Sequence, residues 1–299
     1  MSKVSIIGAN GYIARNLYYH LSGLKEADEI YLYDCFDESA DKNVNYTKVD
    51  ILNREDLCKV NFDCDYIFFM AGKTGTAAGF DNYRTFIGVN EIGLLNFIDE
   101  YRKQSSKAKI VFPSTRLIYR GSDQLLPENA EKEFKTVYSI NKFACENYLK
   151  QYSAMFGIRY CIFRICVPYG TRIDGASSYG TAEFMVKQAM TNREITLYGD
   201  GSIRRTWTHI DDICRALICG AFSEACTNDV FNIGGDNLRL KEVAEMICSE
   251  YNASVKFVPW PEQSLAIESG STVFDDSKFV SATGFKYIRH LKKWERNDL

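Results

Sequence analysis

The sequence predicts an α/β protein built on a doubly wound parallel sheet, with a smaller carboxyl-terminal domain. Three observations carry this prediction. Short β-rich apolar runs alternate with amphipathic stretches through the first half, a glycine turn follows the first run, and the alternation stops after Arg164. Such alternation is typical of a parallel sheet covered by helices on both faces. Right-handed crossovers then give a Rossmann-type order, with ligands at the carboxyl ends of the strands.

Six apolar runs are expected to form the strands, and the helical patterns lie between several of them. The strands begin at Val4, Ile30, Tyr46, Asp65, Lys109 and Arg159, and the helices lie near residues 11–22, 83–103 and 136–156. Residues 1–165 are assigned to the first domain. A helix near 181–191, short strands and two more helices form the smaller domain over 166–299. A later segment near 203–233 is a candidate to pack back on the first domain.

Composition excludes several classes of function. The chain of 299 residues has a formal net charge of −3, so it lacks the positive field that nucleic acid or an anionic membrane would require. No stretch approaches 18 uninterrupted apolar residues, and we expect neither a signal peptide nor a membrane span. The ten cysteines are spread singly without a CxxC, beside only three histidines. We therefore expect no metal site and a reducing, cytoplasmic location.

The segment Gly8-Ala-Asn-Gly-Tyr-Ile-Ala14 lies between the first strand and the first helix. Glycines at positions 8 and 11 permit a tight turn, and the helix N-terminus offers free N–H groups to a pyrophosphate. Asp34 ends the second strand about 20 residues later, where a carboxylate would accept the adenosine ribose hydroxyls. Cys35 and Phe36, which follow it, supply no cation for a 2′-phosphate. The sequence therefore favours NAD over NADP as the cofactor.

A second motif indicates acid–base chemistry. Tyr138 and Lys142 stand four residues apart at the start of a predicted helix, which puts the phenol and the ammonium on one face. A neighbouring cation would stabilise the phenolate and lower the pKa of the phenol, giving a usable acid and base. The hydroxyl of Thr115 ends the preceding strand and is positioned to bind the substrate oxygen. We assign Thr115, Tyr138 and Lys142 as the catalytic set.

These motifs together resemble the extended short-chain dehydrogenase/reductases of the NAD-dependent epimerase/dehydratase family, which act on nucleotide-sugars. The resemblance runs almost end to end, through GANGYIA, KVDIL, VNEIGLLNFI, PSTRLIYRG, YSINK, RICVPYG, LYGDGSIRRTWTHIDD, FNIGG and FDDSKFVSATGF. With the loop and Asp34, it implies the following cofactor-binding residues: Gly8, Asn10, Gly11, Tyr12, Ile13, Asp34, Asp50, Ile51, Ala71, Gly72, Lys73, Asn90, Tyr138, Lys142 and Val167.

The resemblance also implies a substrate-binding set. Arg205 matches the arginine that holds the substrate's diphosphate, and Thr181 and Arg116 complete the set. The 4,6-dehydratases carry an acidic pair after the catalytic threonine, where this chain has Arg116-Leu117, which argues against dehydration. Two interpretations of Arg116 stay open: a ligand for a substrate phosphate or carboxylate, and a surface salt bridge.

The leading functional hypothesis is an epimerase that oxidises a ring carbon with bound NAD and then reduces it on the other face, with C4 as the favoured carbon. A 4-ketosugar reductase or 4-dehydrogenase would use the same residues, and a non-catalytic cofactor-binding regulator is a remoter alternative. The resemblance further implies a homodimer formed by the helices near 83–103 and 136–156. Phe97, Ile98 and Phe143 in these helices are alternatively part of the core of one chain.

Overall fold

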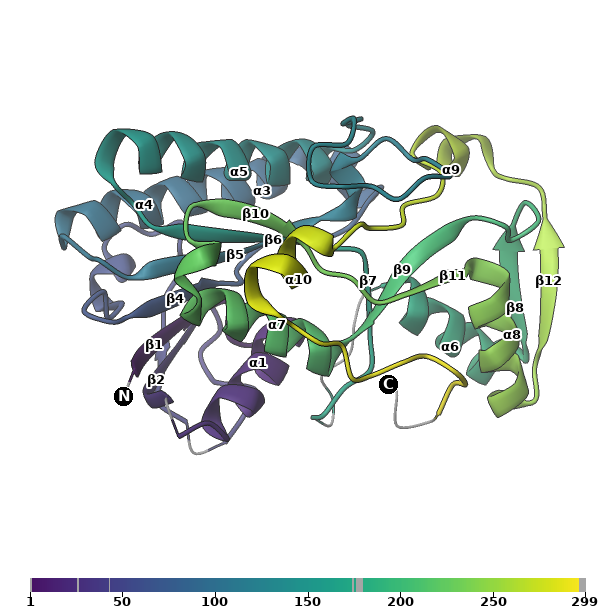
Figure 1. Cartoon of the computed structure of the whole chain (residues 1–299), viewed down its shortest axis with the longest axis horizontal. Helices are drawn as coiled ribbons and strands as arrows, with labels where there is room; N and C mark the ends of the chain where they lie inside the picture. Colours follow the sequence, from purple (N-terminus) through teal and green to yellow (C-terminus); the bar gives the residue numbers. More distant parts are fainter. Residues whose placement is uncertain (1, 26, 43, 174, 176–179, 296–299) are drawn as a thin grey trace.

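The computed structural model describes residues 2–25, 27–42, 44–173, 175 and 180–295. Its main sheet has seven strands in the order β10-β6-β5-β4-β1-β2-β3, and every neighbouring pair is parallel (Figure 1). The strands are β1 (Ser2–Ile7), β2 (Ala27–Asp34), β3 (Tyr46–Lys48), β4 (Tyr66–Phe69), β5 (Lys109–Thr115), β6 (Tyr160–Ile165) and β10 (Asp229–Asn232). The order reverses between β1 and β4, which confirms the predicted doubly wound α/β fold.

Helices cover both faces of this sheet because each buries an apolar stripe on it. On one face α1 (Tyr12–Ser22) and α7 (Ile210–Phe222) pack side by side, and α10 (Ser277–Thr283) adds the buried ring of Phe279. On the other face lie α4 (Gly93–Lys103) and α5 (Val137–Phe156). The predicted helix near 83–103 consists of α3 (Tyr83–Ile87), a π-helical turn (Gly88–Ile92) and α4, preceded by α2 (Ala78–Asp81). Single 3₁₀ turns occupy Asp56–Lys59, Arg116–Ile118 and Glu224–Cys226.

The smaller domain lies beyond the carboxyl ends of the main strands (Figure 1). It contains a three-stranded sheet of β7 (Val167–Tyr169), β9 (Arg204–His209) and β11 (Asp236–Arg239), and a parallel pair of β8 (Glu194–Tyr198) and β12 (Ser254–Val258). Helices α6 (Thr181–Asn192) and α8 (Leu240–Tyr251) pack on the parallel pair, and α9 (Glu262–Ala266) follows β12. The indole of Trp207, fully buried, lies in the core of this domain.

The chain crosses between the two domains more than once. After β9 it returns to the main sheet, where α7 packs on α1 and β10 pairs with β6 at the sheet edge. Asp211, near the start of α7, accepts hydrogen bonds from Arg172 at 2.6 and 2.9 Å and from Arg289 at 3.0 Å, and its carboxylate lies 3.0 Å from the His20 ring. These contacts join α1 and α7 to the segments that carry Arg172 and Arg289.

Candidate active site

The glycine loop lies where β4 and β1 end side by side. Gly8 has φ +85°, and a Cβ at this position would lie 2.5 Å from the backbone nitrogen of Ala71, so only glycine fits. Among the described residues no side chain caps the N-terminus of α1, which begins after Gly11. The first N–H groups of this helix are therefore available to an anion in front of the loop.

Asp34 lies beside this loop at the end of β2. Its carboxylate accepts a hydrogen bond from the backbone nitrogen of Asn10 at 2.9 Å and one from that of Cys35 at 2.7 Å. Arg15, in the first turns of α1, is bound by the carboxylate of Asp41 through contacts of 2.7 to 3.2 Å. Because Asp41 neutralises this guanidinium, Arg15 offers no free cation to a phosphate near Asp34.

The catalytic set comes from two neighbouring elements. Thr115 ends β5, and its side-chain oxygen accepts a hydrogen bond from the backbone nitrogen of Leu117 at 3.3 Å. Tyr138 occupies the first turn of α5, which a reciprocal capping box between Thr136 and Ser139 fixes in place. One turn further on, the ammonium of Lys142 lies 4.1 Å from the centre of the buried Phe112 ring.

Burial dominates the titration of both catalytic groups. It raises the pKa of the Tyr138 phenol above its ordinary value, and Cys145 adds to the rise, whereas the contact with the Thr115 hydroxyl lowers it. Burial also lowers the pKa of Lys142 to about 8, against the opposing charges of Cys145 and Glu146. Lys142 is not among the groups that shift the phenol in this structure. The expected lowering of the phenol pKa by this lysine is therefore absent from the protein's own side chains.

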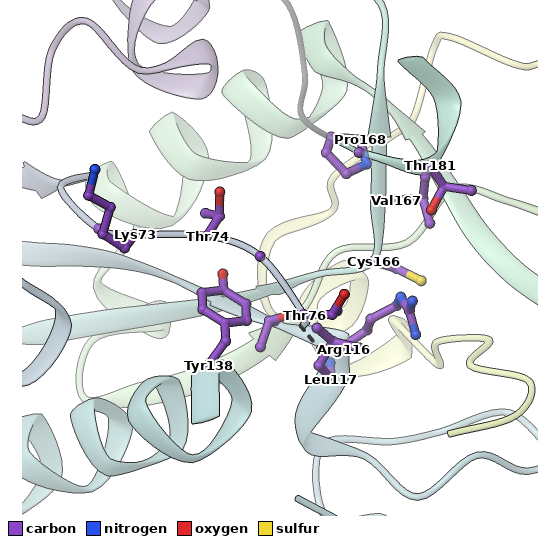
Figure 2. Close-up of a pocket in the computed structure, with 14 residues that line it drawn as sticks. Lys73, Thr74, Thr76, Arg116, Leu117, Tyr138, Cys166, Val167, Pro168 and Thr181 are labelled. Carbon is purple, nitrogen blue, oxygen red and sulfur yellow. Dashed lines mark hydrogen bonds between the residues drawn. The ribbon is translucent and has the colours of Figure 1, made fainter. Parts of the chain in front are cut away.

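Two cavities meet at Thr115 and Tyr138. The first, of about 360 Å³, lies against the glycine loop and is lined by Gly11, Tyr12 and Ile13 together with Lys142. The second, of about 700 Å³, opens toward the smaller domain and is shown in Figure 2. Thr115, Tyr138 and the segment from Gly72 to Thr74 line both cavities. A molecule in either cavity would therefore face the same hydroxyl and phenol.

Comparison with known proteins agrees with this geometry. The family model described as "NAD dependent epimerase/dehydratase family" matches residues 4–234. The chain belongs to this family. A protein of Methanocaldococcus jannaschii named putative UDP-glucose 4-epimerase is 24% identical over 83% of this chain and 82% of its own length.

Solved structures of similar fold include two epimerases. The Thermus thermophilus UDP-glucose 4-epimerase in complex with NAD has a TM-score of 0.82 and 21% identity, and covers 99% of this chain and 96% of its own. A mutant of the Bacillus cereus UDP-glucuronic acid 4-epimerase, in complex with UDP-4-deoxy-4-fluoro-glucuronic acid and NAD, has a TM-score of 0.84 and 21% identity. It covers 97% of this chain and 95% of its own.

The residues of this family member fit its cofactor, NAD. The smaller cavity lies in front of the uncapped N-terminus of α1, which suits a pyrophosphate, and the carboxylate of Asp34 lies beside the same loop. Arg15 is already neutralised by Asp41, which agrees with NAD rather than NADP. Among the described residues no cluster of side chains could hold a metal ion, and no helix is long and apolar enough to cross a membrane. All ten cysteines are free.

Several of the residues predicted to bind the cofactor support the loops that line the two cavities. Asn90, in the π-helical turn, accepts a hydrogen bond from the backbone nitrogen of Lys73 at 2.8 Å and donates one to the backbone carbonyl of Lys73 at 3.1 Å. These two bonds hold the backbone at Lys73, which lines both cavities. Ala71 packs on Gly8. The Asp50 carboxylate accepts from the backbone nitrogen of Leu52 at 2.9 Å, and the buried Ile51 packs against α4. These last two lie outside both cavities.

The substrate-binding predictions separate into two groups. The larger cavity is lined by Arg116 and Thr181 (Figure 2). It is also lined by Val167, which the sequence assigned to the cofactor. Arg205 lines neither cavity. Its buried guanidinium instead binds the Glu268 carboxylate at 2.5 Å and donates to the carbonyl of Gly270.

Sequence reasoning missed two features of the site. The first comprises further residues that line the larger cavity: Thr74, Gly75, Thr76, Leu117, Cys166, Pro168 and Gly180. The run Lys-Thr-Gly-Thr after β4 is the signal that would have identified the first three, because a glycine-containing loop at the carboxyl end of a parallel strand is a usual ligand position. The second is a buried ion pair of Arg164 and Glu146, beneath the catalytic set, for which the sequence holds no signal.

Proposed function

We propose that the protein is a nucleotide-sugar epimerase that inverts a ring carbon of the sugar, C4, through transient oxidation with bound NAD. One observation carries the proposal: Thr115 and Tyr138 line both cavities, so a cofactor and a substrate would meet at these two side chains. The larger cavity, of about 700 Å³, has room for a sugar ring and part of its nucleotide. Among the described residues of its lining no carboxylate stands beside Thr115, which disfavours the elimination step of a dehydratase.

The proposed reaction gives each catalytic residue a task. Tyr138, as phenolate, accepts the proton of the C4 hydroxyl. Its place in the first turn of a 20-residue helix favours the anion, because the helix dipole is positive there. The oxygen of Thr115 accepts from Leu117 and its hydroxyl contacts the Tyr138 phenol, so Thr115 is placed to bind the sugar oxygen beside the base. Lys142 holds the nicotinamide ribose, and the Thr115 hydroxyl is the group that lowers the pKa of the phenol against the effect of burial.

Bound NAD supplies the acceptor of the hydride and then its donor. The residues expected to hold it are the loop from Gly8 to Ile13, Asp34 at the adenosine ribose, and Lys142. In an epimerase the 4-keto sugar rotates within the larger cavity so that its other face meets the cofactor. Tyr138 then returns the proton to the C4 oxygen, which gives the alcohol of inverted configuration. Arg205 as a ligand of the substrate's diphosphate stays a prediction, because Glu268 binds its guanidinium in this structure.

The proposal is tested by the nucleotide that the purified protein carries. Denaturation should release near-stoichiometric NAD, identified by chromatography and mass spectrometry, and the protein should then invert UDP-sugars without consuming added cofactor. An empty or NADP-loaded protein would instead indicate a 4-ketosugar reductase or a 4-dehydrogenase, which exchanges its cofactor at every turnover.

We also propose that the protein is a cytoplasmic homodimer, associated through the outer face of α3 and α5. Phe97 and Ile98 are fully buried in the core and take no part in this face. Large apolar side chains are nevertheless exposed on these two helices: Ile87, Ile140, Met155 and Phe156. Sedimentation should show a species of twice the 34.1 kDa chain mass at micromolar concentration, and Ile140→Glu should convert it to monomer. A wild-type protein that sediments only as monomer would refute the dimer.

A further inference from the structure

Arg116 occupies the larger cavity with part of its hydrogen-bonding capacity unused. It directly follows Thr115, and its side chain extends into the cavity toward Cys166 and Thr181, away from Tyr138 (Figure 2). The residue as a whole is half-buried, but its Nη1 atom is buried and has no hydrogen-bond partner. An unsatisfied buried donor is destabilising, and for a charged group the penalty is larger. Such groups are uncommon in native proteins, and a bound partner that supplies the missing acceptor is one explanation for them.

The nearest charges do not neutralise Arg116. The guanidinium of Arg205 is close enough to lower the pKa of Arg116, together with the larger effect of burial, to about 10. Arg116 therefore stays protonated at neutral pH. Glu268 also acts on Arg116 electrostatically, but its carboxylate is bound to Arg205 at 2.5 Å. The three groups together carry one unbalanced positive charge.

The described part of the cavity wall offers no anion to balance that charge. Among the described residues that line it, Lys73 and Arg116 are the charged side chains, and none is a carboxylate. Lys73 is exposed and lies on the far side of Tyr138, where the two cavities join (Figure 2). Arg116 thus offers a planar fork of donors to one monoanion, within the part of the cavity that begins at Thr115.

We propose that Arg116 binds a carboxylate carried by the sugar ring, and that the substrates are nucleotide-sugars of the uronic acid class. This rests on the proposed function, because it takes Thr115 and Tyr138 as the groups at the reacting carbon. Two observations favour a sugar carboxylate over the diphosphate. Arg116 is the next residue after the hydroxyl that contacts Tyr138 and lines the same cavity, so a substituent on the far side of a ring held at Thr115 would lie within its reach. One unbalanced charge also matches a monoanion.

The test compares matched ligands on wild type and on Arg116→Leu. Binding of UDP, UDP-glucose and UDP-glucuronate, and of GDP-mannose and GDP-mannuronate, is measured by calorimetry with NAD present. Wild type should bind the uronate of one pair more tightly than its neutral partner, and Arg116→Leu should reduce that ratio by roughly 10- to 100-fold. Arg120→Leu is the matched control: this exposed arginine pairs with Glu131 outside the larger cavity and should leave the ratio unchanged.

The outcomes separate this inference from the proposed function. Equal binding of the acidic and the neutral sugar by wild type would overturn it. So would an equal loss of affinity for UDP and UDP-glucuronate in Arg116→Leu, since the arginine would then bind the diphosphate. A wild-type protein that binds none of the five ligands would overturn the proposed function as well. The melting temperature of Arg116→Leu should equal or exceed that of wild type, because an unpaired buried charge is removed, whereas a structural arginine would give a clear fall.

Discussion

Glu146→Gln tests whether the buried ion pair holds the catalytic set in position. The Glu146 carboxylate accepts hydrogen bonds from Arg164 at 3.0 and 2.6 Å and from the hydroxyl of Ser114 at 2.5 Å. Both charged side chains are almost completely buried. Ser114 precedes Thr115 on β5, and Glu146 lies on the same helix as Tyr138, so this carboxylate ties the two catalytic elements together.

The substitution keeps the shape of the side chain and removes its charge. It leaves the guanidinium of Arg164 buried without a counter-ion, which costs about 3–5 kcal/mol. In a protein of this size that corresponds to a fall of roughly 6–10 °C in the melting temperature. The double variant Glu146→Gln/Arg164→Met removes both charges and should recover much of the loss. Glu131→Gln, which breaks the exposed pair with Arg120, should cost less than about 1 kcal/mol.

Thermal unfolding and steady-state kinetics together check this reasoning. Because Glu146 acts through Ser114 and α5, it is a positioning residue, so kcat should fall at least about tenfold while KM for the nucleotide-sugar changes little. A melting temperature within about 1 °C of wild type, below the fall expected for a broken buried pair, would refute the structural argument. A normal kcat in a destabilised variant would refute the positioning role.

Three further substitutions have expected outcomes. Gly8→Ala places a methyl group 2.5 Å from the backbone of Ala71, so the loop must shift and the purified protein should lose its NAD; Gly284→Ala, with a similar positive φ but open space, should retain it. Lys142→Met should abolish turnover yet raise the melting temperature at pH 7, because burial lowers the pKa of Lys142 to about 8 from an unfolded value of 10.5. Between these two pKa values the unfolded state binds more protons than the folded state, so wild-type stability should rise with pH. The difference in melting temperature between Lys142→Met and wild type should therefore be smaller at pH 10 than at pH 7, and an equal difference at both would contradict this. Thr136→Ala removes one half of the capping box of α5 and should lower stability by about 1 kcal/mol in denaturant titration; an unchanged midpoint would show that the cap does not fix the first turn.

Much of the first domain is predictable because its signals are local. The β-rich runs and the glycine turn of Gly8 and Gly11 depend on neighbours in sequence, and the structure has a strand or a helix at each expected place. The edge strand β10 is different: four residues long, it pairs with β6 about 70 residues earlier in the chain. Its place depends on a return of the chain from the smaller domain, which no local pattern encodes.

The site shows the same division between local and distant information. Tyr138 and Lys142 are one helical turn apart, so their shared cavity follows from spacing. The environment of Arg205 depends on Glu268, 63 residues away, and the sequence gives no sign of that pairing. The surroundings of Arg116 also depend on distant segments. Cys166 and Thr181 line the same cavity, and the Nη1 atom of Arg116 is buried without a hydrogen-bond partner, which favours the ligand interpretation as a proposal.

We propose that Tyr138 is the acid and base of a reaction between bound NAD and a nucleotide-sugar. The most direct measurement follows inversion at C4 by proton NMR in wild type and in Tyr138→Phe, with nucleotide-sugars that bind the wild type. Wild type should invert the sugar without net formation of NADH, and Tyr138→Phe should retain NAD but react at least about a hundredfold more slowly. Equal rates in the two proteins would refute the role of Tyr138, and wild-type turnover that accumulates NADH in step with product would refute the epimerase.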